Sequence, residues 1–234
     1  MMKVFELPGE EQKRRLLQRP IQPQQQLREI VTGILEKVKD EGDQALIDFT
    51  RMFDSVELID IRVNEADLAK ARVDQELQNG IILAKNNIQK FHQSQLIDEP
   101  VVETISGVNC WRKSVAIEKV GLYIPGGTAP LFSTVLMLGV PAALAGCREI
   151  VLCSPPDKNG RIHPALLFAA NLLGIEKVYK VGGAQAIGAM AYGTESIPRV
   201  HKIFGPGNQF VTRAKEMVQT EGVAIDIPAG PSEV

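Results

Sequence analysis

Three short stretches of this sequence place glycines and a polar side chain where a strand is expected to give way to a helix. They are KVGLYIPGG (119–127), KVGGAQ (180–185) and IFGPGN (203–208). Glycines at such turns let the backbone approach a phosphate closely, and the positive end of the following helix dipole favours an anion there. The chemistry that these stretches suggest is the binding of a phosphorylated small molecule.

Each stretch also has a purely structural interpretation. The turn at 126–127 can be a plain tight turn, and Asn208 can simply cap the helix that follows it. Gln185 can hydrogen-bond a ligand or its own backbone, and Tyr123 can stack on a flat ligand or pack into the core. The standard dinucleotide fingerprint, GxGxxG with an acid at the end of the second strand, is absent, because that strand ends in Cys-Ser-Pro at 153–155.

Catalytic machinery is not visible in the residues. None of the three histidines has a second histidine or an acid at metal-ligand spacing, and no GxSxG elbow, Walker loop or Cys–His pair is present. Structural or solvated roles are expected for His92, His163 and His201. The residues alone therefore predict a ligand-binding edge without an identifiable acid–base group, nucleophile or metal site.

The elements that would hold these stretches begin with a helical N-terminal third. Apolar residues recur at helical spacing from Leu27 to Val38, and the DEGD segment at 40–43 ends that helix before a second one. Asn64 is suited to cap a third helical region. A longer helix is expected to direct four apolar side chains towards a core: Ile81, Ile82, Ile88 and Phe91.

Two segments before residue 119 have the pattern of strands. VELIDIRV (56–63) alternates apolar and polar residues, and β-branched residues flank Ser106–Gly107, which predicts a β-hairpin.

From Lys119 onward, short apolar strands alternate with helices, and each strand ends in glycine, proline or small polar residues. This alternation predicts an α/β fold with a mostly parallel, incomplete Rossmann-like sheet and helices on both faces, preceded by the helical region and the hairpin. We expect a division into residues 1–118 and an α/β domain at 119–234. Right-handed crossovers would gather the glycine-rich loops at the carboxyl ends of the strands, where ligands bind in such sheets.

Composition narrows the class of protein. Hydrophobic residues make up 44% of the 234 residues and charged residues 23%, with a net charge of −2, so neither nucleic acid nor an anionic membrane is an expected partner. No apolar run reaches the ~18 residues of a membrane span, and the charged start lacks a signal-peptide core. Three cysteines in no zinc pattern fit free thiols, and we expect a cytoplasmic protein.

Taken together, the longer motifs resemble histidinol dehydrogenase. They are VGLYIPGGTAPLFSTVLMLGVPA, EIVLCSPP, the segment from VGGAQAIGAMAYG to FGPGNQFVTRAK, and AIDIPAGPSEV, and the resemblance covers nearly the whole chain. It implies an NAD-dependent oxidation of L-histidinol through L-histidinaldehyde to L-histidine, the last steps of histidine biosynthesis. It also implies a homodimer with a zinc ion that holds the substrate, on incomplete Rossmann-like domains.

The resemblance assigns roles to four residues through their motifs. Tyr123, Gln185 and Asn208 correspond to contacts with NAD, and Ser232 to a contact with the substrate. The zinc ligands and the acid–base pair of the family lie downstream of AGPSEV, so the resemblance implies no catalytic residue and no metal ligand in this chain.

We therefore expect an N-terminal part of the enzyme, interrupted within its α/β domain and inactive alone. A non-catalytic nucleotide-binding or interaction module derived from the enzyme is the alternative. Another aldehyde dehydrogenase is a weaker possibility, because Cys110, Cys147 and Cys153 lack the context of a catalytic thiol.

Overall fold

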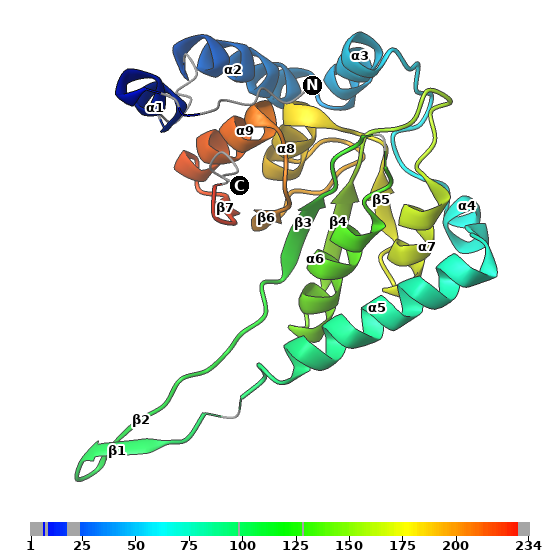
Figure 1. Cartoon of the computed structure of the whole chain (residues 1–234). Coiled ribbons are helices and arrows are strands. Elements are labelled where there is room, and N and C mark those ends of the chain that lie inside the picture. The colour runs from blue at the N-terminus through cyan, green and yellow to red at the C-terminus, as the bar shows by residue number, and fades with distance from the viewer. Residues whose placement is uncertain (1–6, 8, 18–23, 98, 128, 229–234) are drawn as a thin grey trace.

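The computed structural model describes residues 7, 9–17, 24–97, 99–127 and 129–228 (Figure 1). Its centre is a five-stranded, fully parallel sheet with the strand order β5-β4-β3-β6-β7. The strands are β3 (Lys119–Tyr123), β4 (Glu149–Cys153), β5 (Lys177–Tyr179), β6 (Lys202–Phe204) and β7 (Ala224–Ile225). Helices cover both faces of this sheet, so the expected α/β class is confirmed.

The two faces of the sheet enter two separate cores, because side chains alternate along each strand. Tyr123 and Cys153 point into one core, whereas Leu122 and Leu152 point into the other. β3 is apolar on both faces and is buried from its second residue onward, as strands of a covered parallel sheet are. β3 and β4 are paired in register along their whole length, from Lys119 opposite Glu149 to Tyr123 opposite Cys153. Their carboxyl ends therefore lie side by side.

Helices from the second half of the chain connect the strands. They are α6 (Phe132–Leu144), α7 (Pro164–Leu172), α8 (Gly183–Tyr192) and α9 (Gln209–Thr220). α8 and α9 contact each other in the same core as Tyr123, and α6 and α7 contact each other in the core of Leu122.

The N-terminal helices complete both layers. α2 (Gln24–Glu41) and α3 (Asp43–Asp54) pack on α8, and α5 (Gln75–Gln93) packs along α6, as Figure 1 shows. α4 (Glu65–Lys70) contacts α7, and the short α1 (Glu10–Leu17) precedes α2. The expected division of the chain at residue 118 stays a prediction.

Local signals place several helix boundaries. The DEGD segment separates α2 from α3 at Gly42, which has φ +56°, and Asn64 caps α4 by accepting a hydrogen bond from the Ala66 amide.

The apolar face of α5 is narrower than its sequence suggested. Ile81 is fully buried, but Ile82 is 38% exposed and Phe91 is 65% exposed. The prediction that both of these face a core is therefore wrong, because α5 touches the rest of the protein on one narrow side only.

The segment at 56–63 forms a single bridge rather than a strand. Arg62 pairs antiparallel with Tyr179 of β5, flanked by bonds from Val63 N to Val178 O and from Lys180 N to Ile61 O. The segment thereby covers the outer edge of β5, where an unpaired row of amides would otherwise be exposed.

The predicted hairpin is present as β1 (Val102–Ile105) and β2 (Val108–Cys110), and it projects away from the sheet (Figure 1). All residues of both strands are exposed. Within the described part of the chain, no helix has both the length and the apolar character needed to cross a bilayer.

Candidate functional site

A cavity of about 710 Å³ opens where the parallel strands end. The turns after β3, β4, β5 and β6 all contribute to its wall, and α2 and α3 close it from the N-terminal layer. The lining residues are Ile30, Ile34, Phe53, Asp54, Tyr123, Pro125, Gly126, Gly127, Pro155, Pro156, Gly183, Ala184, Gln185, Asn208 and Phe210. The cavity lies at the carboxyl ends of the strands, which is where an open α/β sheet binds its ligands.

Glycines allow these turns to approach one another. A Cβ added to Gly126 or to Gly182 would come within 2.5 Å of the Pro155 ring. Gly205 has φ +134°, and a Cβ there would collide with the carbonyl oxygen of Tyr123. Glycine is therefore required at these positions by close packing between loops, which brings Tyr123 near the turn that carries Asn208.

Tyr123 ends β3 and is only 3% exposed. Its hydroxyl oxygen accepts a hydrogen bond of 3.0 Å from the Gly183 amide at the start of α8. Burial raises the pKa of the phenol to about 12, so the hydroxyl keeps its proton at neutral pH. The ring of Tyr123 therefore packs in the core, as one of the two interpretations of the sequence predicts, and the residue also lines the cavity.

Gln185 lies in the first turn of α8, lines the cavity and is 1% exposed. Its side-chain oxygen Oε1 is buried and has no hydrogen-bond partner among the described residues. An unpaired buried acceptor costs about 1–3 kcal/mol of stability. A solvated or self-capping glutamine is excluded, and a ligand that donates a hydrogen bond to Oε1 would remove this cost.

Asn208 caps α9, as the structural interpretation of its motif predicts. Its Oδ1 accepts hydrogen bonds from the amides of Phe210 and Val211, at 3.0 and 3.1 Å. Those two amides are therefore engaged and do not offer themselves to an anion. Because Asn208 also lines the cavity, its side-chain NH₂ group is the part that can meet a ligand.

A buried lysine fixes the turn that precedes Asn208. Lys215 of α9 is 5% exposed and donates to the Gly205 carbonyl at 2.9 Å, and its ammonium group also pairs with the Asp226 carboxylate. Asp226 in turn accepts a hydrogen bond of 2.8 Å from the Gly205 amide. Both backbone polar groups of Gly205 are thus held, so the turn is rigid where it meets the cavity.

Two lining residues from α3 were not found by sequence reasoning. Phe53 is 54% exposed and stacks on Phe49 with 5.6 Å between ring centroids, and Asp54 follows it at the end of the helix. The Asp54 atom Oδ2 is buried without a hydrogen-bond partner in the described structure, and burial raises the pKa of this carboxyl. Nothing local marks either residue, because about 70 residues separate them from Tyr123.

The histidines and the buried cysteine have structural positions. His92 is half-buried on α5 and its Nδ1 lies 2.9 Å from Gln95 Oε1, His163 caps α7 through its Nδ1, and His201 is exposed before β6. Cys153 is fully buried, and burial raises the pKa of its thiol, so it cannot act as a nucleophile. The described residues contain no cluster of three or more His, Cys, Asp or Glu side chains able to hold a metal ion.

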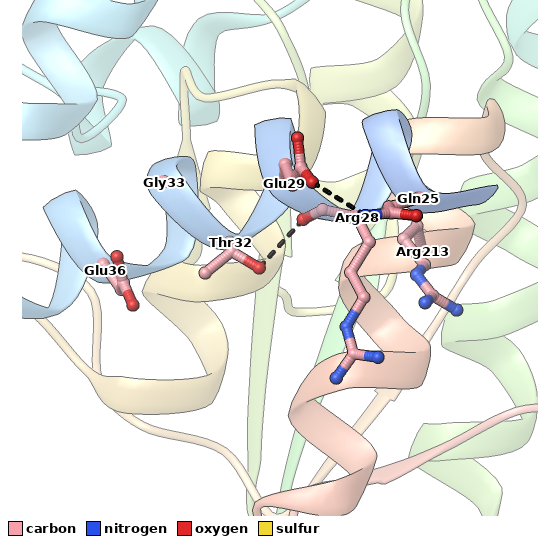
Figure 2. Close-up of a pocket in the computed structure, with 7 residues that line it drawn as sticks. All are labelled: Gln25, Arg28, Glu29, Thr32, Gly33, Glu36 and Arg213. Carbon is pink, nitrogen blue, oxygen red and sulfur yellow. Dashed lines mark hydrogen bonds between the residues drawn. The ribbon is translucent and has the colours of Figure 1, made fainter. Parts of the chain in front are cut away.

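A second groove, of about 690 Å³, lies between α2 and α9 (Figure 2). Its side chains bond mainly to their own helices: Gln25 donates to Glu29, the Thr32 hydroxyl to the Arg28 carbonyl, and Arg213 to Glu216. Two arginines and two glutamates line it, so the formal charges of its walls cancel. It is a polar seam between two helices rather than a candidate ligand site.

Fold and cavity together define an α/β protein with a candidate small-molecule site at the carboxyl edge of a parallel sheet. The family model described as histidinol dehydrogenase matches residues 17–234, and the chain belongs to this family.

The relatives that this chain matches are longer than the chain itself. Histidinol dehydrogenase of Bacteroides thetaiotaomicron is 58% identical over the whole of this chain and 55% of its own length, and that of Xylella fastidiosa strain Temecula1 is 55% identical over 89% and 49%. The crystal structure of histidinol dehydrogenase from Elizabethkingia anophelis superposes with a TM-score of 0.89 at 54% identity, covering 96% of this chain and 52% of that one. The chain thus spans about half the length of the relatives that it matches.

Of the four residues that the sequence motifs single out, three lie together. Tyr123 ends β3, whereas Gln185 and Asn208 lie at the starts of α8 and α9, and all three line one cavity. Ser232 lies outside the described residues.

Proposed function

We propose that this chain provides the NAD-binding part of a histidinol dehydrogenase, which oxidises L-histidinol through L-histidinaldehyde to L-histidine. The observation that carries the proposal is the buried, unpaired Oε1 of Gln185, in a cavity that it shares with Tyr123 and Asn208. NAD fits this donor and acceptor set because it offers amide and hydroxyl donors as well as phosphate and ribose acceptors.

The three side chains take complementary roles in this proposal. Gln185 Oε1 accepts a hydrogen bond from the cofactor, and the Tyr123 hydroxyl and the Asn208 NH₂ group donate to it. NAD bound here would supply the hydride acceptor for the reaction, with one NAD molecule used in the oxidation of the alcohol and a second in the oxidation of the hydrated aldehyde. The protein holds the cofactor in one orientation and keeps water from the packed turns around it.

We assign the substrate contact, the zinc ligands and the acid–base pair to residues outside this cavity. Ser232 is proposed as a substrate contact, and zinc ligands and the acid–base pair are proposed to come from segments that follow the AGPSEV motif in the family. No described residue is given a part in metal binding. The homodimer implied by the family remains part of the same proposal.

A single substitution tests the NAD site. Gln185→Leu removes an unpaired acceptor of similar volume, so we expect the free energy of unfolding to rise by about 1 kcal/mol. The same change should weaken NAD binding about tenfold in isothermal titration calorimetry, because one bond of about 1.4 kcal/mol is lost. Gln219→Leu, at an exposed position near the end of α9, is the matched control and should leave NAD binding unchanged.

Two results would contradict the proposal. A wild-type chain that is folded by circular dichroism but does not bind NAD would refute the cofactor site, and so would Gln185→Leu with wild-type affinity. With L-histidinol, NAD and zinc supplied, this chain alone should bind NAD without forming NADH. NADH formation would show that its own residues include the acid–base and metal groups.

A further inference from the structure

Lys215 places a charged group in the interior of the protein. It lies in α9 and is 5% exposed, whereas lysines are rarely buried in proteins unless they are paired. Its ammonium group donates to the Gly205 carbonyl at 2.9 Å and pairs with the Asp226 carboxylate. Asp226 in turn accepts a hydrogen bond of 2.8 Å from the Gly205 amide. The two side chains therefore hold both backbone polar groups of one residue between them.

A buried ion pair is an inefficient way to stabilise a fold. The cost of removing two charges from water largely offsets their attraction, so an apolar pair of similar volume is often equally stabilising. What a charged pair adds is direction. The ammonium group has to face two acceptors at once, and the carboxylate has to face both that group and the Gly205 amide. An apolar pair could fill the same space without fixing the orientation of the peptide groups on either side of Gly205.

The turn that this pair holds leads directly to Asn208. A Cβ at Gly205 would collide with the Tyr123 carbonyl oxygen, so the turn lies against the end of β3. A Cβ at Gly207 would collide with the side chain of Val211, so the turn also lies against the start of α9. Asn208 follows, with its Oδ1 bonded to amides of α9 and its NH₂ group left for the cavity. The direction of that NH₂ group therefore depends on where the turn holds the Asn208 backbone.

We propose that Lys215 and Asp226 are positioning residues, which fix the Gly205 turn so that the Asn208 NH₂ group faces the ligand in the cavity. Neither of the two side chains lines the cavity, so both act through Asn208 rather than by contact with the ligand. This assignment rests on the proposed NAD site and adds to it a pair of residues that lie behind the cavity wall.

The test separates the stability of the protein from its affinity for NAD. Lys215→Met/Asp226→Asn removes both charges, so it leaves no unpaired buried charge and should recover part of the stability that Lys215→Met loses. It does not restore the donor to the Gly205 carbonyl. We therefore expect calorimetry to show NAD binding about tenfold weaker than in the wild type for both variants, at a temperature where circular dichroism shows each to be folded. Lys90→Met, at an exposed position of α5, is the control and should bind NAD as the wild type does.

A double-mutant cycle with Asn208 tests whether the pair acts through that residue. Asn208→Ser keeps a side-chain oxygen that can cap α9 but removes the NH₂ group. In this background, Lys215→Met/Asp226→Asn should change the dissociation constant of NAD less than about twofold, because the group that it misplaces is already gone.

Three results would count against these assignments. If Lys215→Met/Asp226→Asn binds NAD with wild-type affinity, the pair has a structural role only. If its loss of affinity is equally large in the Asn208→Ser background, the pair does not act through Asn208. Both results would overturn this inference and leave the NAD site standing. A folded wild-type chain that does not bind NAD would overturn the proposed NAD site and this inference with it.

Discussion

Replacing Lys215 with methionine should destabilise the protein strongly. The side chain is 7% exposed and makes two interactions, a hydrogen bond of 2.9 Å to the Gly205 carbonyl and the ion pair with Asp226. Methionine fills most of the same volume but leaves the Asp226 carboxylate without its cation. Breaking a buried ion pair costs about 3–5 kcal/mol, and the lower end of this range applies because Asp226 is 29% exposed and can be hydrated.

The expected loss of about 3 kcal/mol corresponds to a fall in Tm of about 6–12 °C for a domain of this size. Urea unfolding followed by circular dichroism measures it, with Lys90→Met, at an exposed position of α5, as the control. The double variant Lys215→Met/Asp226→Asn should be more stable than Lys215→Met, because the uncompensated charge is removed. A loss below about 1 kcal/mol in Lys215→Met would refute the argument that this pair anchors the Gly205 turn.

Three further variants test the neighbouring contacts. Gly205→Ala should cost about 2 kcal/mol or more in urea unfolding, because φ +134° and the Tyr123 carbonyl both oppose a Cβ; a neutral effect would deny the close approach. Tyr123→Phe leaves the Gly183 amide without its acceptor, so that amide should exchange with deuterium faster, at a cost of about 1 kcal/mol. Burial raises the folded-state pKa of Asp54, so ionisation destabilises the native state as pH rises above 3.8. Asp54→Asn should therefore be more stable than wild type at pH 7 but not below pH 3.8, and a less stable variant at pH 7 would contradict this sign.

The sheet and its connections could be predicted from the sequence because their signals are local. Every strand from β3 to β7 is a short apolar run that ends in glycine, proline or a small polar residue, and each linking segment is long enough for a helix. The hairpin around Ser106–Gly107 was predicted for the same reason. The alternation at 56–63 was real as well, but only Arg62 pairs with β5, so burial of alternate side chains did not require a full strand.

The candidate site could be predicted only in part. Tyr123, Gln185 and Asn208 stand next to turn signals, and parallel connections place all such turns on one edge. Asp54 and Phe53 carry no such signal, because α3 reaches the cavity through its tertiary packing on α2 and α8. The second strand of the fold ends without an acid, so the standard dinucleotide fingerprint gave no signal for the site either.

The unpaired polar atoms of the cavity are both hydrogen-bond acceptors, and this property limits which ligands fit. Gln185 Oε1 and Asp54 Oδ2 are both buried acceptors, whereas Asn208 uses its oxygen for the helix cap and keeps its NH₂ group. These two acceptors therefore favour a ligand with at least two hydrogen-bond donors. A carboxylate or a phosphodiester offers no donor at neutral pH, and either anion would face the Asp54 carboxyl. A dinucleotide carries amide and hydroxyl donors along its length, and this distribution of donors supports the proposed NAD site.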